Sequence, residues 1–233
     1  MIYVPLIQIN LYKRYFLMIK CTQVCKRYPL GFEALNQVNF ELGKGEMVFL
    51  TGHSGAGKST LLKLIAKLDT PCSGEIEVNG IHLNRLKKKN IASYRSSLGI
   101  ALQSPQLLSN RSVFDNVALP LHIQGTAPLQ LSKRVHTALD MVGLLDKKKN
   151  LPIHLSQGEQ QRLGLARAIV HKPTLLIADE PTGNLDPNLA CEIMALFEQF
   201  NQAGLSILIA THDLRLIARM KHRILILKGG KIC

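Results

Sequence analysis

The stretch MVFLTGHSGAGKSTLL at Met47–Leu62 decides the fold of this chain. Its first part, Met47–Thr51, is an apolar run that predicts a buried strand, and apolar residues from Leu61 onward recur at helical spacing. The turn between them, Gly52–Ser59, has the pattern G-x-x-x-x-G-K-S of a phosphate-binding loop. A strand that leads through such a turn into a helix predicts an α/β fold that binds a nucleotide.

The chemistry of the turn follows from its residues. Glycines allow several backbone N–H groups to point at a phosphate chain, and the following helix adds its positive end. We expect Lys58 to reach the β- and γ-phosphates and the Ser59 hydroxyl to bind Mg²⁺. An accidental glycine turn is the alternative, but its four fixed positions would match in only roughly one chain in a hundred of this length. The residues expected to contact the nucleotide here are Gly52, His53, Ser54, Gly55, Ala56, Gly57, Lys58, Ser59 and Thr60.

Length and composition agree with this expectation. The 233 residues suit one large domain or one domain with an inserted subdomain, and 46% hydrophobic with 5% aromatic residues suits an α/β protein. A net charge of +13 suggests an anionic partner, either nucleic acid or anionic lipid, although short runs such as Lys87–Lys89 are usually only solvated faces. Five scattered cysteines favour a reduced, cytosolic setting over a metal site.

The first 17 residues show no clear period. Their apolar start is short, contains Pro5 and runs into Lys13 and Arg14, which argues against a membrane-spanning helix and against a secretory signal. We therefore expect residues 1–17 to be an appendage and the folded domain to begin at Met18.

Two acids follow a second apolar strand pattern, Thr174–Ala178. Ending a buried strand in paired carboxylates is unfavourable unless they serve a cation or a reaction. Beside a phosphate-binding loop, Asp179 is expected to hold Mg²⁺, directly or through water, and Glu180 to polarise the water that attacks the γ-phosphate. An acidic turn without function is the alternative.

Polar residues also follow two further apolar runs. Gln103 follows Leu98–Leu102 and is a candidate ligand of Mg²⁺ or of water, because α/β sheets place ligand contacts at the carboxyl ends of their strands. His212 follows Ser206–Ala210 and is a candidate hydrogen-bond partner of the γ-phosphate. Taken alone, each is more often a structural residue, so both assignments depend on the whole set.

Between these strands the pattern becomes helical. Val113–Leu121 and Ala127–Val142 carry apolar residues at helical spacing, which predicts a helical subdomain inserted into a parallel-sheet core. Farther along, Ser156-x-x-Glu159 is a capping box before a helix over Gln160–Val170. Capping alone would explain Ser156, but a capped helix start beside Gly158 is also an anion site, for a phosphate of this chain or of another.

Tyr28 precedes the turn between two strand-like runs in Lys20–Glu46. Its ring could stack on a purine base, and without the phosphate-binding loop simple packing would be the preferred reading.

In chain order these motifs resemble those of the ABC-type ATPases. The Walker A, Q-loop, signature, Walker B, D-loop and H-loop correspond to Gly52–Ser59, Gln103, Leu155–Gln160, Leu176–Glu180, Asn184–Asp186 and His212. The sequence within and around these motifs, for example at Asp115–Leu121 and Ala178–Asp186, resembles the FtsE family of cell-division ATP-binding proteins. The resemblance extends from about Met18 to the C-terminus.

The resemblance implies the architecture and the reaction. A P-loop NTPase (RecA-like) core, about 18–103 and 163–233, would carry an antiparallel β subdomain and an inserted α-helical subdomain, about 104–162. ATP would be hydrolysed with Mg²⁺ in a head-to-tail homodimer. In that dimer Ser156 and Gly158 would contact the opposite γ-phosphate, Asp186 would connect the two sites, and Tyr28 would stack on adenine.

The FtsE resemblance also implies partners. It suggests a polytopic, FtsX-like membrane protein at the cytoplasmic face of the bacterial inner membrane and a role in regulating cell-wall hydrolases at the division site, with division-site proteins as further partners. The surface near Gln103–Asn110 and the helical subdomain would receive the membrane protein, and the positive charge would suit anionic lipid. Nucleic acid is then not expected as a partner.

Two other functions compete. An ATPase of a lipoprotein-release or macrolide-export transporter shares the motif at Pro181–Asp186. A soluble ABC ATPase acting on DNA or ribosomes would explain the charge, but this chain has a single motif set and no sustained heptads. A binding module without turnover is disfavoured by Glu180. One departure is Gln157, which replaces the usual first glycine of the signature and would be strained if that position required a positive φ.

Overall fold

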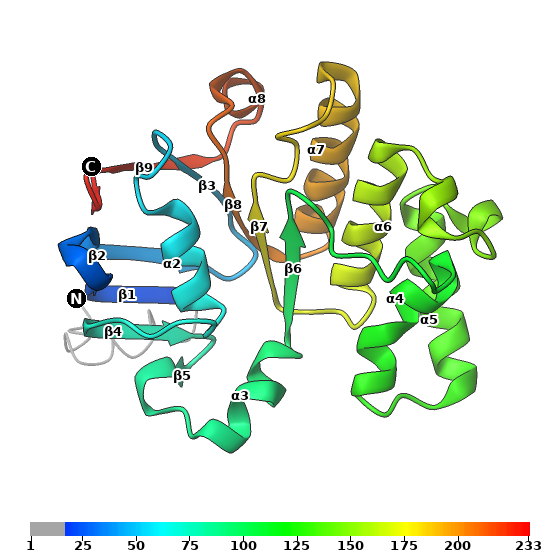
Figure 1. Ribbon diagram of the computed structural model, residues 1–233, viewed down its shortest axis with the longest axis horizontal. Coiled ribbons are helices and arrows are strands. Elements are labelled where there is room, and N and C mark those ends of the chain that lie inside the picture. The colour runs from blue at the N-terminus through cyan, green and yellow to red at the C-terminus, as the bar shows by residue number, and fades with distance from the viewer. Residues whose placement is uncertain (1–16) are drawn as a thin grey trace, which may run out of the picture.

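Two β-sheets and a helical lobe make up the chain, which a computed structural model describes over residues 17–233 (Figure 1). A small antiparallel sheet lies at the left of Figure 1, and the larger sheet lies in the middle. At the right lie the helices α4 (Val113–Ile123), α5 (Pro128–Met141) and α6 (Gln157–Ile169). Leu17 is already part of the first strand, one residue before the expected start of the domain. The rest of the predicted appendage lies outside the described residues.

The larger sheet has six strands in the order β10-β9-β3-β8-β7-β6. All neighbours are parallel except β9 and β10. Its strands are β3 (Met47–Thr51), β6 (Leu98–Leu102), β7 (Leu175–Asp179), β8 (Ser206–Ala210), β9 (Arg223–Lys228) and β10 (Lys231–Ile232). The sheet brings the carboxyl ends of β3, β8, β7 and β6 to one edge, which is where the predicted motifs begin.

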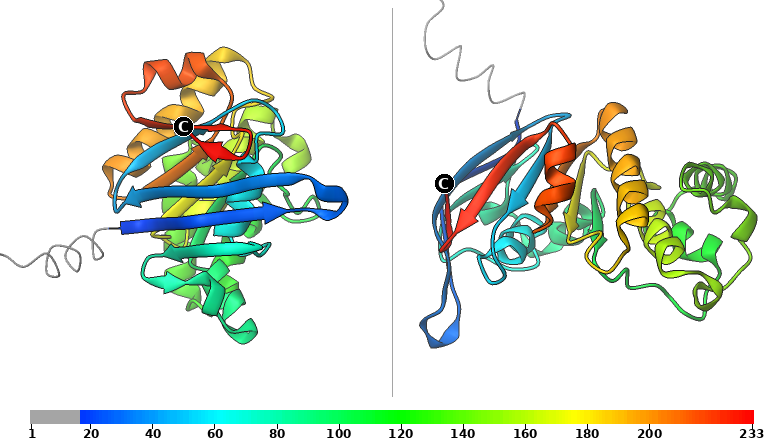
Figure 2. Two further views of the ribbon diagram at one scale, coloured as in Figure 1. Left: turned by 90° about the vertical axis from the view of Figure 1, so that its left-hand side faces the viewer. Right: turned by 90° about the horizontal axis from the view of Figure 1, so that it is seen from above.

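The smaller sheet is antiparallel, in the order β2-β1-β4-β5. Its strands are β1 (Leu17–Arg27), β2 (Glu33–Gly43), β4 (Ser73–Val78) and β5 (Ile81–His82). β4 and β5 form a hairpin around the turn at Asn79-Gly80. The long β1–β2 hairpin, drawn in blue, projects beyond the rest of the fold, and its tip holds the 3₁₀ turn η1 (Pro29–Gly31) next to Tyr28 (Figure 2).

Both faces of the larger sheet are covered, which is why its strands read as continuous apolar runs. Alternate residues point to opposite faces. Val48 and Leu50 join the core beneath α2 (Lys58–Ile65) and the smaller sheet, whereas Met47 and Phe49 join the core beneath α6 and α7 (Pro187–Gln202). The helices α2 and α6 therefore pack on opposite faces of the sheet.

The helical lobe matches the predicted inserted subdomain. It is formed by α4 (Val113–Ile123), α5 (Pro128–Met141) and α6 (Gln157–Ile169), together with the turns η3 (Leu145–Lys147) and η4 (Pro152–His154). The predicted boundary at 162/163 falls inside α6, which packs against α4 and α5 and also against β6. α6 thus joins the lobe to the sheet.

Four helical elements complete the fold. They are η2 (Leu83–Arg85), α3 (Lys88–Arg95), α7 (Pro187–Gln202) and α8 (Leu214–Arg219). Within residues 17–233, none of the helices combines the length and apolar character that a bilayer crossing requires.

Candidate active site

The phosphate-binding loop has the backbone that its glycines predict. Gly57 is the N-cap of α2 with φ of 106°, and a Cβ atom there would lie 2.3 Å from the carbonyl oxygen of Ala34. Only glycine meets both conditions. Lys58 is buried at the first position of α2, and its Nζ donates to the carbonyl of Gly52 at 2.8 Å. Ser59, the next residue, is exposed.

The first of the two acids at the end of β7 is Asp179. Asp179 is the last residue of β7, and within residues 17–233 its Oδ1 is buried without a hydrogen-bond partner. A buried, unpartnered carboxylate oxygen fits a cation ligand, so the residue suits the predicted Mg²⁺ role.

Glu180 lies between the phosphate-binding loop and the end of β8. Its Oε1 is 3.6 Å from Lys58 Nζ and 2.9 Å from His212 Nδ1. Its φ is 48°, a strained value for a glutamate, and its N–H donates to the carbonyl of Ala210 on β8 at 2.8 Å. The structure therefore brings three predicted residues, Lys58, Glu180 and His212, into one cluster.

Gln103 is connected to the D-loop. Its Nε2 donates to Asn184 Oδ1 at 3.2 Å, and a Cβ atom on Gly183 would lie 2.9 Å from that same nitrogen. The chain is fixed to α6 on both sides of Gln103, because Gln161 donates to the carbonyl of Leu102 at 3.0 Å and Arg167 to the carbonyl of Gln106 at 2.7 Å. Sequence spacing did not predict these attachments.

The signature has the capping box that its sequence predicts. Ser156 Oγ accepts from the N–H of Glu159, and the Glu159 carboxylate accepts from the N–H of Ser156. The Lys147 ammonium also binds this carboxylate, and together with the Ser156 N–H it holds the pKa of Glu159 below its usual range. Gly158 faces α7, where a Cβ atom would lie 3.0 Å from Leu189 Cδ1.

Gln157 is not strained. It is the first residue of α6, and it is absent from the residues with positive φ among those that the structure describes. The concern that a glycine-specific conformation is required there is therefore removed. Since α6 and α2 pack on opposite faces of the sheet, the fold does not join Ser156 and Gly158 to the phosphate-binding loop of the same chain.

Asp186 caps α7, and its Oδ1 accepts from the N–H groups of Asn188 and Leu189 at 3.0 and 3.1 Å. This contact explains the residue structurally. It leaves the expected role between two sites as a prediction.

Tyr28 has two polar neighbours that sequence analysis missed. Its hydroxyl donates to Asp69 Oδ2 at 3.2 Å, and the ammonium of Lys26 lies 5.0 Å from the ring centroid. Lys26 Nζ also binds Asp69 Oδ1 at 2.6 Å. The two contacts with Asp69 join residues more than 40 positions apart, and no spacing in the sequence signals them.

Asp69 keeps its negative charge despite partial burial. Burial acts to raise the pKa of its carboxyl, but hydrogen bonds from Lys26, the Thr70 N–H and Tyr28, with the charge of Lys26, outweigh this and hold the pKa below its usual range. Ala34, at the start of β2, lies against Gly57 of the phosphate-binding loop. The stacking of Tyr28 on adenine stays a prediction, for a ring whose hydroxyl is anchored by Asp69.

Comparisons with known proteins agree with this geometry. The ABC transporter family model matches residues 35–183. The cell division ATP-binding protein FtsE of Escherichia coli strain K12 is 52% identical over 215 residues, covering 92% of this chain and 97% of that protein. FtsE of Bacillus subtilis strain 168 is 41% identical, and the match covers 92% of this chain and 94% of that protein.

Among solved structures, the bacterial ABC transporter cassette MJ0796 is 35% identical, with a TM-score of 0.84, covering 92% of this chain and 96% of that one. Its structure is dimeric, and a second dimeric structure of the same cassette holds ADP and Pi in a post-hydrolysis state.

Proposed function

Because the chain belongs to the FtsE family of ABC-type ATPases, we propose that it is the ATP-hydrolysing subunit of a membrane complex that regulates cell-wall hydrolysis in bacterial cell division. The observation that carries the proposal is the joining of Lys58, Glu180 and His212 in one cluster, in a chain that is similar to FtsE proteins over nine-tenths of its length.

The residues of this cluster divide the reaction among them. Lys58, on the helix that follows the loop, offers its charge to the phosphates of ATP. Glu180 accepts a proton from the attacking water, and His212, whose Nδ1 lies 2.9 Å from that carboxylate, orients it. Mg²⁺, when bound, neutralises charge on the phosphates, and Ser59, Asp179 and Gln103 are the residues that would hold it.

The signature of a second copy would complete each site. Ser156 and Gln157 are exposed at the start of α6, and the capping box leaves the other N–H groups of the first turn available to an anion. In the proposed head-to-tail homodimer, Ser156 and Gly158 bind the γ-phosphate held by the opposite Lys58. Hydrolysis removes the charge that bridges the two copies, so ATP controls whether the dimer is closed.

The segment around Gln103, residues 102–108, suits the proposed membrane partner, an FtsX-like polytopic protein. Leu102 and Leu108 are large apolar side chains that remain 41% and 39% exposed. The same segment is anchored to α6 through Gln161 and Arg167. A push on this segment would therefore be transmitted to α6 and to the signature at its start. We therefore propose that the chain lies at the cytoplasmic face of the inner membrane, where its positive charge would suit anionic lipid.

The experiment is affinity purification of the Glu180→Gln variant from detergent-solubilised native membranes with ATP, followed by mass spectrometry. The variant is expected to lose hydrolysis between about 10² and 10⁴ fold while it still binds ATP, so that the complex stays closed. Glu75→Gln, an exposed carboxylate on β4, is the matched control and should retain activity.

Recovery of an FtsX-like membrane protein with division proteins supports the proposal. An export or lipoprotein-release permease in its place would move the function to transport. Nucleic acid or ribosomes without a membrane protein would refute the membrane role.

A further inference from the structure

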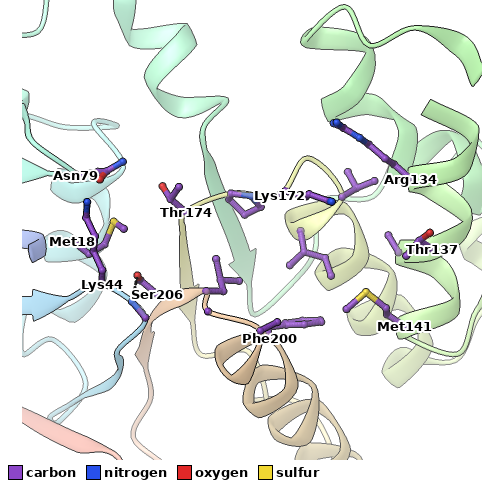
Figure 3. Close-up of a pocket in the computed structure, with 18 of the residues that line it drawn as sticks. Met18, Lys44, Asn79, Arg134, Thr137, Met141, Lys172, Thr174, Phe200 and Ser206 are labelled. Atoms are coloured by element: carbon purple, nitrogen blue, oxygen red, sulfur yellow. Dashed lines mark hydrogen bonds between the residues drawn. The ribbon is translucent and has the colours of Figure 1, made fainter. Parts of the chain in front are cut away.

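A pocket of about 920 Å³ lies at the edge of the larger sheet opposite the phosphate-binding loop (Figure 3). The residues that precede the strands form one side of it: Lys44 before β3, Lys172–Thr174 before β7 and Gly204–Leu205 before β8. The other side is α5. No residue of the segment 103–110 lines the pocket, so it is separate from the surface assigned above to the membrane partner.

The charges in this pocket have one sign. Four cationic side chains line it, Lys44, Lys133, Arg134 and Lys172, and no aspartate or glutamate does. Within residues 17–233 none of these four side chains forms an ion pair or hydrogen bond. In Figure 3 Arg134 extends from α5 and Lys172 from the α6–β7 turn, and both reach into the pocket. Four unpaired cations that converge on one concave surface favour an anionic occupant.

The floor of the pocket is apolar. Met141 of α5, which is 43% exposed, lines it together with Phe200 of α7 and Leu205. The size lies within the range of known ligand sites, and apolar walls with a few charged groups are their usual composition. An occupant must therefore supply apolar side chains as well as negative charge.

Two occupants that the chain itself could supply do not meet this requirement. A second copy carries the same net charge of +13. The segment 1–16 contains no aspartate or glutamate and has two cations, Lys13 and Arg14. Like charges opposed at a contact are unfavourable, so neither is complementary to the pocket.

We propose that this pocket docks an amphipathic acidic segment of a protein partner, with its apolar side chains on the Met141–Phe200 floor and its carboxylates on Arg134, Lys133 and Lys172. A concave pocket between two lobes suits a narrow segment better than the flat surface of a bilayer. Because the segment would contact both α5 and the turns of the core, it would hold the helical lobe at a fixed position relative to the sheet. The inference does not depend on the proposed cell-division role.

The test measures binding of the full chain to a fluorescent synthetic peptide, a short helix with glutamates on one face and leucines on the other, without nucleotide. The pocket variant Lys133→Gln/Arg134→Gln/Lys172→Gln is compared with Lys87→Gln/Lys88→Gln/Lys89→Gln, which lowers the net charge by the same three units on exposed residues elsewhere. The pocket variant should bind the peptide about tenfold more weakly than the unmodified chain, and the control variant should stay within about twofold.

The apolar floor is tested without any change of charge. Met141→Gln should weaken binding about three- to tenfold, and a scrambled peptide of identical composition should bind less tightly than the amphipathic one. Retained ATPase activity shows that each variant is folded.

Three outcomes would overturn the proposal. An equal loss of peptide affinity in the two triple variants would mean that only the overall charge matters. Binding of the scrambled peptide as tight as that of the amphipathic one would mean the same. Pocket-dependent binding to phosphatidylglycerol vesicles without peptide binding would identify the occupant as lipid.

Discussion

The anchored hydroxyl of Tyr28 leads to a quantitative prediction. If the ring stacks on adenine, the Asp69 carboxylate that binds its hydroxyl at 3.2 Å fixes the orientation of the ring. Asp69→Asn keeps the shape of the side chain but removes the charge that holds Lys26 at 2.6 Å. The variant should therefore loosen the ring without disturbing the phosphate-binding loop.

The expected magnitude is bounded by the value of the stacking interaction. An aromatic pair contributes about 0.5–1.5 kcal/mol beyond its buried area, which corresponds to about a two- to twelvefold change in affinity. Tyr28→Ala sets the upper limit, and Asp69→Asn and Tyr28→Phe should both fall below it, because each removes only the anchor. kcat should not change, since Glu180 and Lys58 are untouched.

The assay is equilibrium binding of ATP together with steady-state hydrolysis, so that affinity and turnover are separated. Glu33→Gln is the matched control, because it removes a carboxylate on the same hairpin that pairs with Arg27 and not with Tyr28. If Tyr28→Ala greatly weakens ATP binding and Asp69→Asn leaves it unchanged, the anchor is unnecessary. A lower kcat at unchanged affinity would refute the stacking role itself.

Three further outcomes are expected. Gly57→Ala should lower the free energy of unfolding by about 2–4 kcal/mol in urea titrations, because its Cβ would meet the Ala34 carbonyl at a positive φ, and an unchanged midpoint would contradict this. Lys147→Met should lower the free energy of unfolding by only about 0.5–1 kcal/mol at pH 7, since the lysine is partly exposed. The lowered pKa of Glu159 gives stability that is present above its unfolded pKa and is lost as the pH falls through its folded pKa, so this variant should lose less stability on acidification, and parallel curves would disprove the reasoning. Gln157→Gly should leave ATPase activity within a few fold, because the residue already has helical geometry, and a hundredfold drop would show that its side chain is required.

The sequence predicted the elements whose signals are local. The strand expected over Thr174–Ala178, which the structure has at Leu175–Asp179, and the capping box at Ser156 each follow from a short pattern. No pattern predicted α3, since its single buried residue, Tyr94, gives no apolar period. Nor was β9 predicted, although it occupies a place in the sheet beside β3.

What the sequence could not supply were contacts between distant segments. The anchoring of Tyr28 by Asp69, the attachment of Arg167 to Gln106 and the cationic pocket all join residues from separate elements. The set of polar strand ends was predictable, but their spatial order was not, because β8 lies between β3 and β7 although β6 and β7 precede it in the chain.

That order explains how the strained Glu180 is placed. Because β8 is the neighbour of both β3 and β7, the carbonyl of Ala210 accepts the Glu180 N–H just where β7 ends, and the chain turns there through a positive φ. The left-handed conformation costs about 1–3 kcal/mol, yet it directs the carboxylate back toward Lys58 on the far side of β8. Replacing Glu180 by glycine should relieve the strain and abolish the proton transfer proposed for this residue. Glu180 therefore marks a point where the fold gives up stability to position the carboxylate that we propose as the proton acceptor.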